Sequence, residues 1–198
     1  MSYINKKNEY IRVNGEKIAY RELNKGKSEK PLVMLVHLAA TMDNWDPKFI
    51  DLVSEKQHII LIDLPGVGGS EGKVATTIPG MAQQAIAIIK ELGYSKINLL
   101  GLSMGGMIAQ EVTRLASDLV DKLILVGTGP RDGEGIGTVT STTFKFMLKA
   151  GLNRVDPKRF IFYSHDEKGK IEANKVLDRL ASRSKENADE EMKVPGFL

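Results

Sequence analysis

The sequence predicts an α/β domain built on a mostly parallel sheet with helices on both of its faces. Two observations lead to this prediction. Short runs that are apolar throughout recur along the first 130 residues, and segments with helical spacing lie between them. A strand that is apolar at every position suits a sheet covered on both faces, which is typical of parallel sheets. Right-handed crossovers between such strands place helices on both faces.

The chain opens with a predicted β-hairpin. Residues 10–13 and 17–23 form β-like runs on either side of Asn14 and Gly15. Asn-Gly favours a two-residue hairpin turn, because both turn positions need a positive φ. The polar residues 24–30 then predict a loop.

Four apolar runs predict strands of the parallel sheet, at residues 31–37, 58–64, 97–102 and 122–126. Three helices are predicted between them, at residues 46–54, 79–92 and 104–115. The second helix shows apolar residues at helical spacing and is followed by Gly93, a typical helix stop.

The pattern changes after Pro130. Residues 131–143 are rich in Gly and Thr and predict a loop, and from residue 144 the pattern is helical and polar. The nearest strand candidate there, residues 160–163, is short and flanked by charge. We therefore divide the chain into the front part of an α/β core, residues 1–134, and a partial helical cap, residues 135–198.

Composition excludes several classes of function. The 198 residues carry a net charge of +3 with both signs interspersed, which does not indicate nucleic-acid binding. There is no cysteine, so disulfides and thiolate chemistry are excluded, and the three isolated histidines show no metal-binding spacing. We expect neither metal nor cofactor. The N-terminus has no signal-like apolar region and no run is long enough to span a membrane, so we expect a cytoplasmic protein.

One motif points to chemistry, the hexapeptide GLSMGG at residues 101–106. It satisfies G-x-S-x-G and lies between a predicted buried strand and a predicted helix, the context in which this motif forms a nucleophile elbow. The tight turn strains the backbone of Ser103, and the flanking glycines leave room for it. The helix beginning at Met104 then directs its positive end toward the site.

The chain resembles the α/β-hydrolase superfamily, in particular its esterase, haloperoxidase-like and aminopeptidase-like branch with a Ser-Met-Gly-Gly elbow. Three further segments carry the resemblance, which extends over nearly all of residues 10–130. VMLVH at 33–37 followed by TMDNW at 41–45 resembles the strand and loop that supply an oxyanion donor. DLPGVGGS at 63–70 resembles a mainly architectural segment, and GTGP at 127–130 stands where the family enters its lid.

The resemblance implies an oxyanion hole formed by the backbone N–H groups of Ala39 and Met104, next to the nucleophile Ser103. The family usually has glycine after the histidine of this loop, whereas this chain has Leu38. A side chain at that position could narrow the pocket or displace the loop. We expect His37 and His58 to be structural.

A serine hydroxyl needs a base, and in this fold the acid and the histidine follow the serine along the chain. Only His165 follows Ser103, and Asp132 is the acid that would complete the order. The polar, helical surroundings of His165 favour a surface histidine in the cap over a catalytic one. Asp63 precedes the serine and does not fit the order.

We therefore predict that the intact protein is a serine hydrolase acting on a small ester or amide through an acyl-Ser103 intermediate. We expect this chain to be an incomplete and inactive portion, with the acid and the histidine supplied by a missing C-terminal part or a second chain that completes the sheet. The alternative is a non-catalytic binding protein with the same fold, or one half of a split or swapped assembly.

Overall fold

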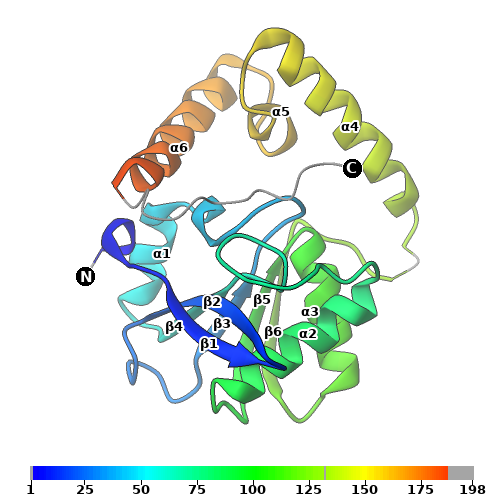
Figure 1. The fold of residues 1–198 in the computed structure, drawn as a ribbon. Helices are drawn as coiled ribbons and strands as arrows, with labels where there is room; N and C mark the ends of the chain where they lie inside the picture. Colours follow the sequence, from blue (N-terminus) through cyan, green and yellow to red (C-terminus); the bar gives the residue numbers. More distant parts are fainter. Residues whose placement is uncertain (1, 132, 187–198) are drawn as a thin grey trace.

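A computed structural model describes residues 2–131 and 133–186 (Figure 1). Its centre is a six-stranded sheet in the order β1-β2-β4-β3-β5-β6. The strands are β1 (Glu9–Val13), β2 (Glu16–Leu23), β3 (Leu32–Leu35), β4 (Ile59–Ile62), β5 (Ile97–Leu102) and β6 (Val120–Val126). β4, β3, β5 and β6 run parallel, while β2 is antiparallel to both β1 and β4. The predicted mostly parallel α/β sheet is therefore confirmed.

Eight helical segments accompany the sheet in the described residues. Two are short 3-10 helices, η1 (Tyr3–Asn5) and η2 (Met42–Asn44). The α-helices are α1 (Pro47–Ser54), α2 (Ile78–Glu91), α3 (Met104–Leu115), α4 (Ile136–Asn153), α5 (Lys158–Ile161) and α6 (Glu167–Glu186). No helix in this part of the chain combines the length and the apolar character that crossing a membrane requires.

The opening hairpin forms as predicted. Val13 pairs with Glu16, and the two residues between them, Asn14 and Gly15, have φ of 51° and 88°. Positive φ at both positions is the geometry that the Asn-Gly pair favours.

The central strands are buried on both faces, which explains their continuous apolar runs. In β3, Val33 and Leu35 pack in a cluster with residues of α2 and α3, whereas Leu32 and Met34 pack in a second cluster that contains Ile50 of α1. Successive side chains of a strand point to opposite faces. A sheet with helices on both sides therefore needs an apolar residue at every position.

The edge strand β6 does not share this burial, although its sequence predicted it. Ile124, Leu125 and Val126 are 42%, 44% and 42% exposed. β5 is the only hydrogen-bonded neighbour of β6 in the described sheet. The strand that this apolar pattern predicts is confirmed, but the expectation that both its faces are covered is wrong for the described residues.

The predicted loop at residues 131–143 is also wrong in its second half, because α4 begins at Ile136. Hydroxyl groups make the Thr-rich stretch compatible with a helix: Thr138 Oγ1 donates to the carbonyl of Gly135 at 2.7 Å, and Ser141 Oγ to that of Thr138 at 2.9 Å. Such bonds satisfy hydroxyls that otherwise compete with the helix. Residues 160–163, the weak strand candidate, overlap the short helix α5 instead.

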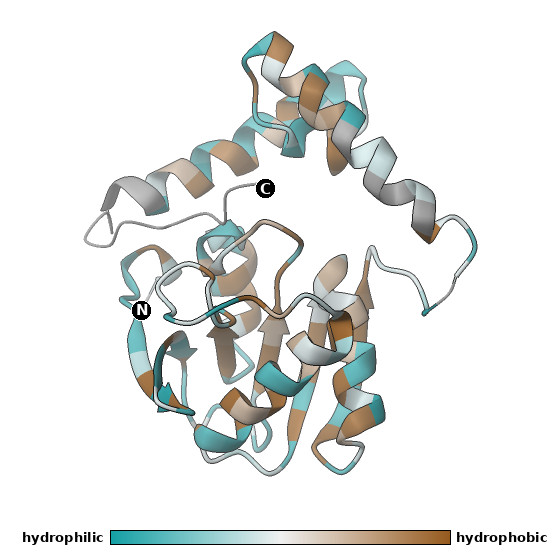
Figure 2. Cartoon of the chain, turned by 45° about the vertical axis from the view of Figure 1, so that its right-hand side comes forward, coloured by the Kyte–Doolittle hydropathy of each residue, from teal (hydrophilic) through white to brown (hydrophobic). Residues whose placement is uncertain are grey.

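Helices α4 to α6 form an arch over the carboxyl ends of the parallel strands (Figure 1). Figure 2 shows the strands pointing toward these helices, which carry both apolar and polar residues. The lower end of α6 comes down beside η1 and α1, and α6 also contacts η2. The arch therefore lies above the end of β5, where the predicted nucleophile stands.

Candidate active site

Ser103 occupies a sharp turn between β5 and α3. Its backbone has φ 55° and ψ −119°, a region that residues with a side chain rarely adopt. The turn is held on both sides: Ser103 N–H donates to the Val126 carbonyl at 2.9 Å, and the Ser103 carbonyl accepts from Gly106 N–H at 2.9 Å. The side chain is half-buried. This is the strained geometry expected of a nucleophile elbow.

The glycines around Ser103 are required by close backbone contacts. A Cβ on Gly101 would lie 2.3 Å from the carbonyl oxygen of Gly105, and a Cβ on Gly105 would lie 2.3 Å from that of Leu35. These contacts press the first turn of α3 against β5 and β3. The motif thus serves packing and leaves Ser103 at the end of the sheet.

The two predicted oxyanion donors come together in space. Ala39 and Met104 line one mostly apolar cleft of about 260 Å³. Met104 is the first residue of α3, where backbone N–H groups have no acceptor within the helix. Ala39 has φ 55°, and Leu38 is 52% exposed. The side chain of Leu38 therefore points toward solvent. The residue with a left-handed backbone conformation is Ala39, one position after the place where the family usually has glycine.

Asp63 lies buried beneath the same cleft and holds the loops around it. Its carboxylate accepts from Met42 N–H at 2.8 Å and Gly69 N–H at 3.3 Å, and its carbonyl accepts from Ser70 Oγ at 2.7 Å. Burial raises the pKa of Asp63 to about 7. These contacts fit the architectural role that the resemblance implies.

His37 and His58 have contacts that fit structural roles. The buried His58 ring contacts Glu22 Oε1 through Nε2 at 2.8 Å. His37 Nδ1 lies 2.8 Å from the Leu38 carbonyl, and its ring centroid is 5.1 Å from that of Phe162. Burial lowers the pKa of His37, which favours its neutral form.

The structure places only one member of the weaker candidate pair, Asp132 and His165. Asp132 lies outside the described residues. His165 Nε2 lies 3.1 Å from the Phe160 carbonyl, its ring stands edge-on to Phe146 and Phe160, and it lines a hollow formed by residues 149–170. No hydrogen bond between a histidine and Ser103 is formed in the described part of the chain.

Sequence reasoning missed a buried ionic cluster next to the loop that contains Leu38 and Ala39, which we call the oxyanion loop after its predicted role. Asp43 Oδ1 accepts from Arg183 Nε at 2.5 Å and lies 2.5 Å from Arg21 Nη1. Arg183 comes from α6, 140 positions along the chain. The only sequence signal is an arginine in a polar helix, which normally indicates a solvated surface.

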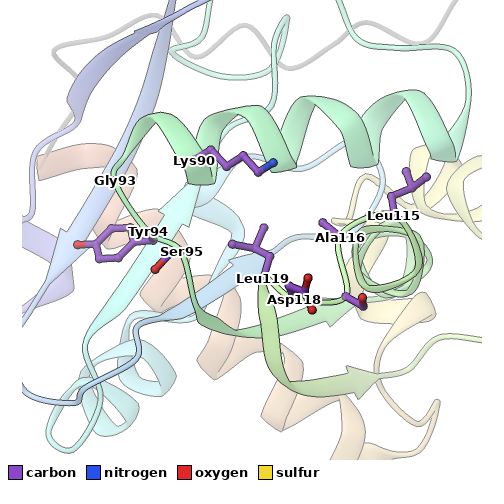
Figure 3. Close-up of a pocket in the computed structure, with 9 residues that line it drawn as sticks. Lys90, Gly93, Tyr94, Ser95, Leu115, Ala116, Asp118 and Leu119 are labelled. Carbon is purple, nitrogen blue, oxygen red and sulfur yellow. The ribbon is translucent and has the colours of Figure 1, made fainter.

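Two further hollows lie at opposite ends of the sheet. One of about 170 Å³ lies between the end of β5 and the arch, where Leu102, His37 and Trp45 face Phe162 and Leu180. A larger one of about 540 Å³ lies at the opposite end of the sheet, between the C-terminal ends of α2 and α3 (Figure 3). None of the predicted site residues lines the larger hollow, so volume alone does not locate the active site.

Known proteins match both the sheet region of this chain and the helices that follow it. Residues 30–188 match the sequence model of the α/β hydrolase fold family. A putative esterase/lipase of Haemophilus influenzae is 37% identical over 108 residues, covering 54% of this chain and 37% of that protein. Esterase YbfF of Escherichia coli is 31% identical over 105 residues, covering 53% and 41%. The matched part of the chain thus covers less than half the length of each of these relatives.

Among solved structures, an α/β hydrolase fold protein from Chitinophaga pinensis superimposes with a TM-score of 0.85 at 30% identity, covering 94% of this chain and 66% of that one. This superposition includes the arch as well as the sheet. Together with the matched family model, the strained serine turn and the sheet order, it leads to one assignment. The chain belongs to the α/β hydrolase fold family.

Proposed function

We propose that this protein is a serine hydrolase that cleaves a small ester or amide through an acyl-Ser103 intermediate. The observation that carries the proposal is the backbone of Ser103, strained at φ 55° at the turn between β5 and α3. Strain of this kind persists where the surroundings enforce it, and it concentrates at functional sites. Relatives named as esterases support the same chemistry.

The proposed reaction is acyl transfer in two steps. Ser103 Oγ attacks the substrate carbonyl carbon while a base takes its proton. The N–H groups of Ala39 and Met104 stabilise the resulting oxyanion, each contributing about 3–4 kcal/mol in comparable sites. Collapse of this intermediate expels the alcohol or amine, which takes up the proton, and water then releases the acid from Ser103 by the same route.

The surroundings of the proposed site suit a small, mostly apolar substrate. The cleft that contains Ala39 and Met104 has a volume of about 260 Å³, and its other lining residues include Leu64, Val67 and Met81. Ligand pockets are typically lined by apolar groups with a few polar groups that fix orientation. The backbone N–H groups would provide that orientation here.

The base belongs to another part of the assembly in this proposal. The three histidines of the chain make polar contacts with other residues, Leu38, Glu22 and Phe160. Ile124, Leu125 and Val126 of β6, each more than 40% exposed, lie on an edge strand with which further strands could pair. We propose that such a segment, from a longer chain or a second chain, brings the acid and the histidine to Ser103.

A second candidate function is binding without catalysis. It is favoured by the same observation that no histidine of the described chain is hydrogen-bonded to Ser103. A strained serine without a base would then be a feature of the fold that does no chemistry.

Fluorophosphonate labelling of the 198-residue chain separates these proposals. We expect slow labelling that is absent in Ser103→Ala and accelerates with added imidazole, which substitutes for a missing base. Labelling that stays absent in imidazole would favour the binding protein. Labelling at the rate of a complete esterase without imidazole would show that the chain contains its own base, and His37→Ala and His165→Ala would then identify it.

A further inference from the structure

The buried cluster around Arg183 connects the arch to the oxyanion loop. Arg183 is fully buried although it belongs to the polar helix α6. Its guanidinium donates to Asp43 and to the carbonyls of Tyr3, Ile4 and Lys6, with 2.8 Å to Ile4 and 2.9 Å to Lys6. A buried arginine is stable only when its donors are paired, so these contacts define one seat for the end of α6.

Asp43, the partner of Arg183, lies in η2, the short helix that follows the oxyanion loop. Only four positions separate Ala39, the proposed donor, from Asp43. Thr41 caps η2 by accepting from Asp43 N–H at 3.3 Å, and Asn44 Oδ1 accepts from Thr41 N–H at 2.8 Å. A displacement of the Asp43 carboxylate therefore also displaces the loop, because only the capped turn of η2 lies between them.

Few apolar contacts hold the last turns of α6. From residue 171 onward, the buried residues among the described side chains of α6 are Ala173, Leu180 and Arg183. Arg179 adds an ion pair with Asp46, at 2.6 Å and partly exposed. Asp46 caps α1 and stands three positions after Asp43 in the sequence. The two arginines thus hold neighbouring but separate points.

We propose that Arg183 is a positioning residue that makes the order of the oxyanion loop depend on the docking of α6. With α6 seated, Arg183 and Arg21 share the Asp43 carboxylate and hold η2 in place. With α6 displaced, Asp43 keeps only the tie to Arg21, and the loop carrying Ala39 loosens. The arch then acts on the proposed oxyanion hole as well as covering it. The catalytic part of this inference rests on the proposed function, whereas the coupling between α6 and the loop does not.

Hydrogen exchange measured by mass spectrometry tests the coupling without any reaction. In Arg183→Met we expect amides of residues 38–44 and of α6 to exchange about tenfold faster or more, because a hydrogen bond to a charged group is lost. The matched control, Arg179→Met, removes the ion pair with Asp46 and keeps the contact of Arg183 with Asp43, so it should accelerate exchange at the start of α1 and leave residues 38–44 unchanged. Faster exchange in α6 of Arg183→Met with residues 38–44 unchanged would overturn the proposal.

Arg183→Lys keeps the charge and gives up the multiple donors, so we expect intermediate exchange in residues 38–44. If Arg183→Met does not fold, this variant decides alone, and unchanged exchange in the loop would reject the coupling. Ser103 labelling adds the functional readout: the maximal labelling rate should fall about tenfold in Arg183→Met with little change in probe affinity. If wild-type Ser103 does not label, the proposed function fails, and the exchange experiment still decides the coupling.

Discussion

Replacing Asp63 by asparagine should change how the stability of this protein depends on pH. Asp63 is buried beneath the oxyanion loop, and its pKa is raised from 3.8 to about 7 by desolvation. The unfolded chain releases this proton near pH 4, whereas the folded protein keeps it until about pH 7. The wild type therefore loses stability as pH rises through this interval, because the unfolded state binds fewer protons than the native state.

The magnitude follows from the shift. About three pKa units at about 1.36 kcal/mol each give a loss of up to about 4 kcal/mol between pH 4 and pH 8. Asparagine has no proton to lose, and its side-chain oxygen can still accept from Met42 N–H. It gives up the long contact with Gly69 N–H, at a cost of about 1 kcal/mol that does not vary with pH. Asp63→Asn should therefore be slightly less stable than wild type at pH 4 and more stable at pH 8.

Urea unfolding of both proteins at a series of pH values measures this difference, since the other titrating groups cancel. Asp121→Asn is the control, because Lys30 at 2.9 Å lowers the pKa of Asp121 and gives the opposite sign. If the stability difference between Asp63→Asn and wild type changes by less than about 1 kcal/mol from pH 4 to pH 8, Asp63 ionises normally. The reasoning from burial would then be refuted.

Three glycine-related changes give further predictions, each measured by urea or thermal unfolding. Ser103→Gly should be about 1 kcal/mol more stable than Ser103→Ala, because glycine adopts φ 55° without strain; equal stabilities would contradict the strain. Gly105→Ala should lose about 3 kcal/mol or more, because its Cβ would lie 2.3 Å from the Leu35 carbonyl oxygen. A Cβ on Gly151 in α4 would meet no atom within 4 Å, so Gly151→Ala should stabilise the protein by about 0.5–1 kcal/mol. If Gly105→Ala and Gly151→Ala change the stability in the same direction, the packing argument is disproved.

The features that could be predicted from the sequence are those whose cause is local or repeated along the chain. Asn14-Gly15 specifies its turn through the φ values of two residues. The apolar runs of β3 and β4 indicate burial on both faces, because successive side chains of a strand point to opposite sides of the sheet. The elbow at Ser103 is similarly local, since strand, glycine spacing and helix are contiguous.

The prediction failed where partners decide the outcome. The apolar run of β6 cannot indicate whether a neighbour covers it, and Ile124, Leu125 and Val126 are exposed in the described structure. The start of α4 depends on Thr138 and Ser141 bonding to the backbone, an option that propensity counts against a helix. Arg183 is the clearest case, because its burial requires carbonyl groups about 180 positions away to converge on one guanidinium.

The same distinction explains why the two halves of the proposed chemistry differ in how well they can be located. The predicted nucleophile elbow is specified by six consecutive residues, 101–106, and the structure confirms the strained turn at Ser103. A general base is defined only by its position in space relative to Ser103, and each of the three histidines of this chain contacts a different group. The oxyanion loop lies between these cases: Ala39 is placed locally by its own φ, yet η2 behind it is held by Arg183 from the far end of the described chain. The proposed chemistry therefore depends on contacts made by segments distant in sequence, and the contact of Arg183 with Asp43 is one that the structure shows.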